Sequence, residues 1–244
     1  MFLIGSSIHD IYRGALPLDG RLLIFRFRLI INDDGIPMAF YASIGARYGS
    51  AIGIAMPTDD ELIHWVKHPA TPFVPKSVGE LKEGDYAIIS DPYVIKEAGQ
   101  WYMILGARKE GGKACISLYK SDNFVDWEFI GIPLVGEGIK HWEVATLFKL
   151  DNKWVVTYAP QGSCRYYTGT MDFENCHFEP DYNGFLDHSG EAPVMVYAAY
   201  VGMPDQLGRR LLWMTSGGRR PETDVAPMRT CGGRARCGET TPSS

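Results

Sequence analysis

Short apolar runs alternate with turn residues along most of the chain. Between the runs lie short polar segments typical of tight turns, among them Asp33-Asp34-Gly35 and Asp151-Asn152. No window keeps apolar residues at the 3.6-residue spacing of a helix over three turns. The pattern therefore predicts an all-β fold. The predicted strands cover residues 22–31, 36–43, 51–56, 101–107, 114–120, 153–159, 165–170, 194–200 and 209–215.

One unit of this pattern is repeated. Two predicted strands within residues 36–56 lead into a polar turn that ends at Trp65, and two within residues 100–120 lead into a similar turn that ends at Trp127. Residues 153–175 repeat the unit more loosely. Strand-rich units of about 40–60 residues are typical of β-propeller blades. A meandering β-sandwich also has short strands and regular turns, but it does not need the same Asp…Trp turn twice, so we expect a propeller.

The composition narrows the class of partner. The 244 residues carry a formal charge of -5, which argues against a nucleic acid or an anionic membrane as partner. No apolar run approaches the roughly 18 residues of a membrane span. The five cysteines show no spacing typical of zinc or of a redox pair. The composition itself assigns neither a compartment nor an oligomeric state.

The end of the chain differs from the rest. Residues 217–244 are rich in Gly, Arg, Pro and Ser and have no apolar period. Such a segment buries too little apolar surface to offset the entropy of ordering it. We therefore expect a partial propeller domain over residues 1–216, followed by a disordered tail over residues 217–244.

Two carboxylates precede apolar runs in consecutive units. Asp91 lies ten residues before Trp101, and Glu143 lies eleven residues before Trp154. Propellers bind ligands at the mouth of the central channel, so matching positions in adjacent blades would bring both side chains to one site. A pair of carboxylates is the machinery of glycoside cleavage. Because Asp-Pro also opens many strands as a turn, spacing alone leaves a purely structural role open.

The residues around these acids resemble a known family. Ser90-Asp91-Pro92 is similar to the Arg-Asp-Pro motif, and His141-Trp142-Glu143 to the Trp-Glu-Cys motif, of the β-fructosidases of glycoside hydrolase family 32. Residues 55–67, 166–169 and 186–199 resemble further segments of that family in the same order. The resemblance implies a five-bladed β-propeller. This chain would hold about three and a half to four of its blades, truncated at both ends.

The resemblance also implies a chemistry. The family consists of retaining glycosidases that act on β-fructosides such as sucrose and fructans, by hydrolysis or by fructosyl transfer. By this likeness Glu143 is the acid/base residue, Asp91 stabilises the transition state, and Asp187 and Trp142 bind substrate. The implied reaction needs neither a metal nor an organic cofactor.

Several departures keep other interpretations open. The family's nucleophile lies in an N-terminal Asn-Asp-Pro motif without a counterpart here, so we expect the chain to begin beyond it and to have little activity by itself. Ser90 stands in place of Arg, Arg26-Phe27-Arg28 in place of Ser-Gly-Ser, and Val144 in place of Cys. The alternatives are a propeller glycosidase for arabinose or xylose polymers, a propeller that binds carbohydrate without cleaving it, and a protein-interaction scaffold.

Overall fold

The computed structural model describes seven stretches of the chain, and the elements of secondary structure assigned within them are β-strands. In these stretches no helix is long and apolar enough to span a membrane. Asp187 and the predicted tail over residues 217–244 lie outside the described residues. The described residues are 23–45, 49–70, 90–108, 112–136, 142–160, 164–186 and 196–216.

The strands form three four-stranded sheets and one two-stranded sheet, each an antiparallel meander in chain order. The first sheet holds β1 (Leu23–Ile31), β2 (Pro37–Gly45), β3 (Gly49–Pro57) and β4 (Trp65–Lys67). The second holds β5 (Ser90–Glu97), β6 (Gln100–Arg108), β7 (Ala114–Ser121) and β8 (Glu128–Val135). The third holds β9 (Glu143–Leu150), β10 (Lys153–Ala159), β11 (Arg165–Asp172) and β12 (His177–Phe185), and the last holds β13 (Val196–Pro204) and β14 (Arg210–Ser216).

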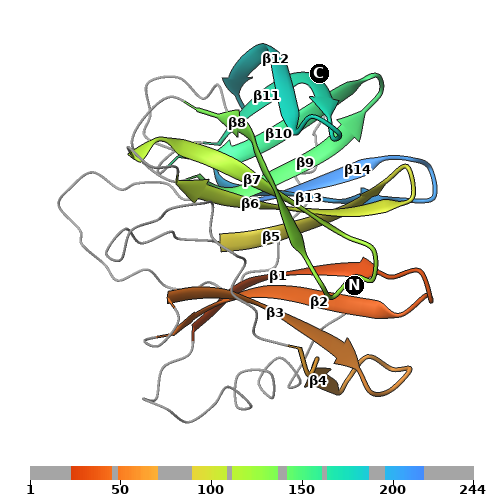
Figure 1. Ribbon diagram of the computed structural model, residues 1–244. Helices are drawn as coiled ribbons and strands as arrows, with labels where there is room; N and C mark the ends of the chain where they lie inside the picture. Colours follow the sequence, from red (N-terminus) through yellow and green to blue (C-terminus); the bar gives the residue numbers. More distant parts are fainter. Residues whose placement is uncertain are drawn as a thin grey trace, which may run out of the picture.

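Consecutive sheets pack against each other through their first strands. β5 lies against β1 and β9, and β13 lies against β9 and β10. The first three sheets follow one another from the bottom of the view to the top, with β13 and β14 beside the inner strands (Figure 1). Meandering sheets whose first strands surround a common axis are the blades of a propeller. The predicted all-β, incomplete propeller is therefore confirmed.

The repeated turn connects the third and fourth strands of each four-stranded sheet. The Asp59 carboxylate accepts the backbone N–H of Ile63 at 2.8 Å, and the Asn123 side-chain oxygen accepts that of Asp126 at 2.8 Å. Asp172 accepts a backbone N–H in the third sheet in the same way. A side chain that binds its own backbone stabilises a tight turn, which is why the repeat is visible in the sequence.

The apolar pattern did not predict the fourth strand of any four-stranded sheet. No predicted run covers β4, β8 or β12. Along β12 only Phe178 is fully buried, since this strand forms the outer edge of its sheet. A strand that exposes most of its side chains carries little apolar alternation, so it cannot be detected by periodicity.

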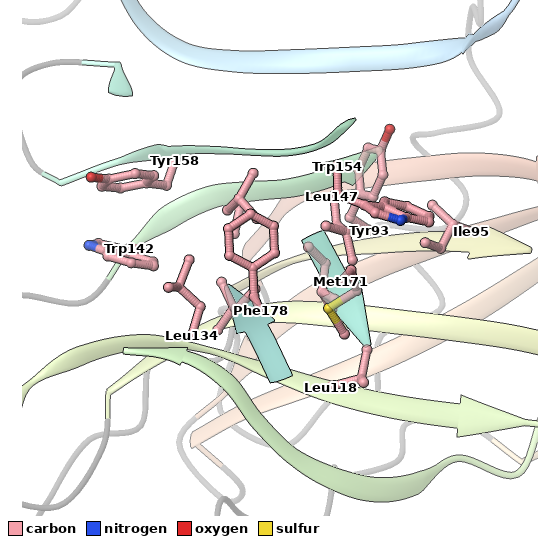
Figure 2. Close-up of a cluster of buried hydrophobic side chains, with 14 of the residues drawn as sticks. Tyr93, Ile95, Leu118, Leu134, Trp142, Leu147, Trp154, Tyr158, Met171 and Phe178 are labelled. Atoms are coloured by element: carbon pink, nitrogen blue, oxygen red, sulfur yellow. The ribbon is translucent and has the colours of Figure 1, made fainter. Parts of the chain in front are cut away.

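The main core lies between the second and third sheets, and a second cluster lies between the first and second sheets. In the main core, Phe178 and Leu147 point between the sheets, and Trp142 and Tyr158 lie side by side at one end (Figure 2). Burial of these side chains from both sheets fixes the packing of β5 against β9.

Candidate active site

The first strands of the last three sheets share a β-bulge near their start. Asp91, Val144 and Ala198 have φ angles of 58°, 53° and 61°, and the pairing register shifts at each of them. Left-handed backbone is uncommon for residues other than glycine and unfavourable for a β-branched side chain such as valine. Because the same bulge recurs in three consecutive sheets, it is a feature of the fold.

The position of the bulge shows that Asp91 and Glu143 are not at equivalent positions of their strands. The residue that pairs with the neighbouring strand immediately before the bulge is Ser90 in β5 and Glu143 in β9. Glu143 therefore matches Ser90, and Asp91 matches Val144. The prediction that the two carboxylates occupy matching positions was wrong by one residue, because the spacing to the following tryptophan differs by one.

The structure nevertheless brings Asp91 and the chain at Glu143 together. The Asp91 carboxylate accepts the backbone N–H of Val144 at 3.0 Å, in the interior of the protein. Asp91 is 7% exposed, whereas Glu143 is half-buried. Since Val144 directly follows Glu143, the Asp91 carboxylate lies against the peptide group that joins these two residues. Both acids thus lie at the start of neighbouring inner strands.

Trp142 lies in the core. It is 1% exposed, and the centroid of its ring is 4.1 Å from that of Tyr158 (Figure 2). A Cβ atom at Gly136 would lie 1.8 Å from the Trp142 ring, and one at Gly106 would lie 1.9 Å from the Trp142 carbonyl oxygen. Two glycines therefore make room for the segment that leads into Glu143. In this arrangement the ring is covered by protein.

A buried arginine lies between the inner strands of the first, second and last sheets. The Arg28 guanidinium lies over the rings of Tyr93, at 4.1 Å, and Tyr200, at 5.3 Å. It donates a hydrogen bond of 2.8 Å to the carbonyl oxygen of Val201, which also accepts the Tyr93 hydroxyl at 3.1 Å. Burial raises the pKa of Tyr200 to about 12. Among the described residues no carboxylate forms an ion pair with Arg28.

No local feature of the sequence indicates this arrangement. Arg28 stood out only because it replaces a small residue of the resembled family, and Tyr93 and Tyr200 are ordinary strand aromatics in the pattern. Their proximity depends on the way β1, β5 and β13 meet, which no local signal encodes.

Asp33, a carboxylate near the start of the described chain, lies away from Asp91 and Glu143. Asp33 forms part of the tight turn after β1 and accepts hydrogen bonds from Lys96 and, at 3.0 Å, from the indole of Trp101. Lys96 lies at the end of β5, opposite to Asp91. The hydrogen bond from Lys96 lowers the pKa of Asp33. The tight turn predicted at Asp33-Asp34-Gly35 is confirmed. No cluster of three His, Cys, Asp or Glu within the described stretches is arranged to hold a metal ion.

Comparison with known proteins identifies a family and several relatives. The family model "Glycosyl hydrolases family 32 N-terminal domain" matches residues 28–224. The chain is 30% identical over 158 residues to sucrose-6-phosphate hydrolase of Bacillus subtilis, which covers 56% of this chain and 32% of that protein. It is 28% identical over 171 residues to a probable sucrose-6-phosphate hydrolase of Psychromonas ingrahamii, covering 66% and 29% respectively. The chain thus spans about a third of the length of these relatives.

Solved structures share the fold. Fructan 1-exohydrolase IIa from Cichorium intybus in complex with 1-kestose superposes with a TM-score of 0.66 at 20% identity, covering 78% of this chain and 39% of that one. Sucrose-6-phosphate hydrolase from Lactobacillus gasseri gives a TM-score of 0.61 at 20% identity and covers 78% and 40%. These neighbours are five-bladed β-propellers, in agreement with the sheets described above.

Proposed function

Because this chain belongs to glycosyl hydrolase family 32, we propose that it forms part of a β-fructofuranosidase-type glycosidase. One observation carries the proposal. Asp91 and Glu143, the acids of the two motifs that resemble this family, lie at the start of neighbouring inner strands, and Asp91 contacts the backbone next to Glu143. The substrate class is a β-fructoside. The names of the relatives and structural neighbours point to sucrose-6-phosphate and fructans within that class.

In this proposal the two acids have different tasks. Glu143 protonates the glycosidic oxygen as the bond to the fructosyl unit breaks, and later removes a proton from the water that releases the sugar. Its partial exposure allows contact with a substrate. Asp91 stabilises the positive charge of the oxocarbenium-like transition state through the sugar hydroxyls. Its burial strengthens that interaction, because a charge is screened less away from water.

Other residues complete the proposed site. Asp187 is proposed to bind substrate, as the resemblance implies. For Trp142 we propose an indirect contribution to substrate binding, in which its buried ring fixes the chain that enters Glu143. We propose no nucleophile among the described residues, since Asp33 lies at the end of the sheets opposite to Asp91 and the sequence has no Asn-Asp-Pro motif. In this proposal the covalent step of a retaining mechanism requires a further carboxylate besides Asp91 and Glu143.

The test separates binding from turnover. The purified chain is titrated with sucrose, sucrose-6-phosphate and inulin oligomers by calorimetry, and product release is followed for each. We expect saturable binding of at least one fructoside and turnover several orders of magnitude below ordinary enzyme rates. Glu143→Gln should retain binding, and Glu179→Gln, an exposed substitution on β12, is the matched control.

The other outcomes decide between the alternatives. Fast turnover that Glu143→Gln abolishes would support the glycosidase proposal and contradict the expectation that the chain lacks the nucleophile. Binding of arabinan or xylan in place of fructosides would favour the related glycosidase, and failure to bind any of these carbohydrates would contradict the glycosidase proposal.

A further inference from the structure

One buried hydrogen bond connects the two acids through the backbone. The Asp91 carboxylate on β5 accepts the N–H of Val144 on β9 at 3.0 Å. Asp91 is 7% exposed and Val144 is 1% exposed, so water cannot readily replace this bond. Losing a buried hydrogen bond is costly, which makes the contact a constraint on β9.

The accepted N–H belongs to a strained residue. Val144 is β-branched and has a φ of 53°, a conformation that such residues rarely adopt. Strain of this kind persists only where the surroundings hold the backbone in place. The bulges of β5, β9 and β13 are alike in position, but only the residue in β5, Asp91, has a side chain able to accept a hydrogen bond. The tie from β5 to β9 is therefore specific to this pair of sheets.

We propose that Asp91 is a positioning residue for Glu143. Its carboxylate fixes the Val144 N–H and with it the plane of the peptide group between Glu143 and Val144. The rotation of that peptide group sets the direction in which the Glu143 side chain leaves β9. The hydrogen bond exists whatever the protein binds, whereas its importance for an acid/base residue rests on the proposed function above.

This role divides the effect of Asp91 into two parts. Its charge would act on the sugar, and its hydrogen-bond acceptor acts on the neighbouring strand. A substitution that removes both therefore mixes loss of transition-state stabilisation with displacement of Glu143. Asparagine and glycine separate the two, because both lack the charge and both tolerate left-handed backbone, but only asparagine keeps an oxygen that can accept the Val144 N–H.

The experiment compares Asp91→Asn with Asp91→Gly by NMR on the full-length chain labelled with ¹⁵N and ¹³C. Exchange of the Val144 amide and the position of the Glu143 side-chain carboxyl resonance are measured without any substrate. In Asp91→Asn we expect both to stay close to the unsubstituted protein. In Asp91→Gly we expect the Val144 amide to exchange about tenfold faster or more, and the Glu143 resonance to move or broaden.

Ala198→Gly is the matched control, since it changes the equivalent bulge of β13 and should leave the Val144 amide unaffected. Equal behaviour of Asp91→Asn and Asp91→Gly would overturn the proposal. If the glycine variant fails to fold, a tenfold faster Val144 exchange in folded Asp91→Asn overturns it as well. Because no carbohydrate is present, the result does not depend on whether the chain binds or cleaves fructosides.

Discussion

The second and third sheets are held together differently from the last sheet. Between the former lies a continuous core in which Phe178 is 1% exposed. The last sheet leaves Leu211 and Trp213 55% and 57% exposed and is tied to β1 and β5 by hydrogen bonds from Arg28 and Tyr93 to a β13 carbonyl. The difference shows that Asp91 and Glu143 lie beside a large apolar core, whereas the last sheet combines small apolar clusters around Val201 and Ala199 with polar contacts near the axis.

The comparison predicts a large loss of stability for one aromatic truncation and almost none for another. Phe178→Ala should lower the free energy of unfolding by about 3–5 kcal/mol, because it empties a fully packed site. Trp213→Ala should change it by less than about 0.5 kcal/mol, because the ring is mostly exposed. Denaturant unfolding followed by circular dichroism measures both. Similar losses would show that the last sheet is packed as firmly as the others.

The polar attachment of the last sheet is tested at Arg28. Arg28→Met should lower the free energy of unfolding by about 2–3 kcal/mol, since it removes a charge-assisted hydrogen bond and two contacts with aromatic faces. Faster amide exchange should be concentrated in β13 and β14. Arg209→Met, at an exposed ion pair with Asp205, is the control and should leave exchange in β13 unchanged. Exchange that rises equally in all sheets would contradict a local tie.

Alkaline pH provides a second measure of the same region. Burial raises the pKa of Tyr200 to about 12, whereas an unfolded tyrosine ionises near pH 10. The folded state therefore holds the Tyr200 hydroxyl proton more tightly than the unfolded state does. The contribution of this hydroxyl to the free energy of unfolding is fully present below about pH 10, and about 2 kcal/mol of it is lost as the pH rises to about 12. Tyr200→Phe should reduce that loss, and Tyr182→Phe, at an exposed ring on β12, should not. Unfolding free energies at pH 9 and 11.5 decide the matter.

Much of the fold could be predicted because the second and third strands of the four-stranded sheets bury one or both faces. The first strands β5 and β9 lie outside the predicted strand ranges and were noted only as apolar runs that follow Asp91 and Glu143. The predicted run over residues 153–159 coincides with β10, and the polar turns before Trp65 and Trp127 lie where the repeat placed them. The outer strands β4, β8 and β12 could not be found in this way. Their side chains face solvent or a single neighbour, so hydrophobic periodicity is weak there.

The candidate site could also be predicted only in part. Motif likeness was enough to select Asp91 and Glu143, which the fold then placed on neighbouring strands. The bulge that puts Asp91 out of step with Glu143 and the burial of Trp142 depend on contacts between sheets. A tryptophan beside an acid has the same sequence signature whether it faces a ligand or the core, so only the packing against Tyr158 distinguishes the two.

The smallest predicted effect compares the turns of the two sheets that carry the acids. The β9–β10 turn has Asp151 at a φ of 51°, where a short polar side chain is tolerated, whereas the β5–β6 turn places Ala98 at 48° before Gly99. Ala98→Asn creates the Asn-Gly pair that two-residue hairpins favour. Because Ala98 is exposed, no packing is lost, and the free energy of unfolding should rise by about 0.5–1 kcal/mol.

The turn substitution should act on the scaffold alone. Since Ala98 lies at the end of β5 opposite to Asp91, amide exchange at Val144 should stay unchanged while that of the β5–β6 turn slows. Ala98→Val is the control, because a β-branched residue is disfavoured at positive φ and should destabilise the same hairpin. Denaturant unfolding ranks the three proteins. A lower free energy of unfolding for Ala98→Asn than for the unsubstituted protein would contradict the left-handed turn, and with it the contrast between the two hairpins.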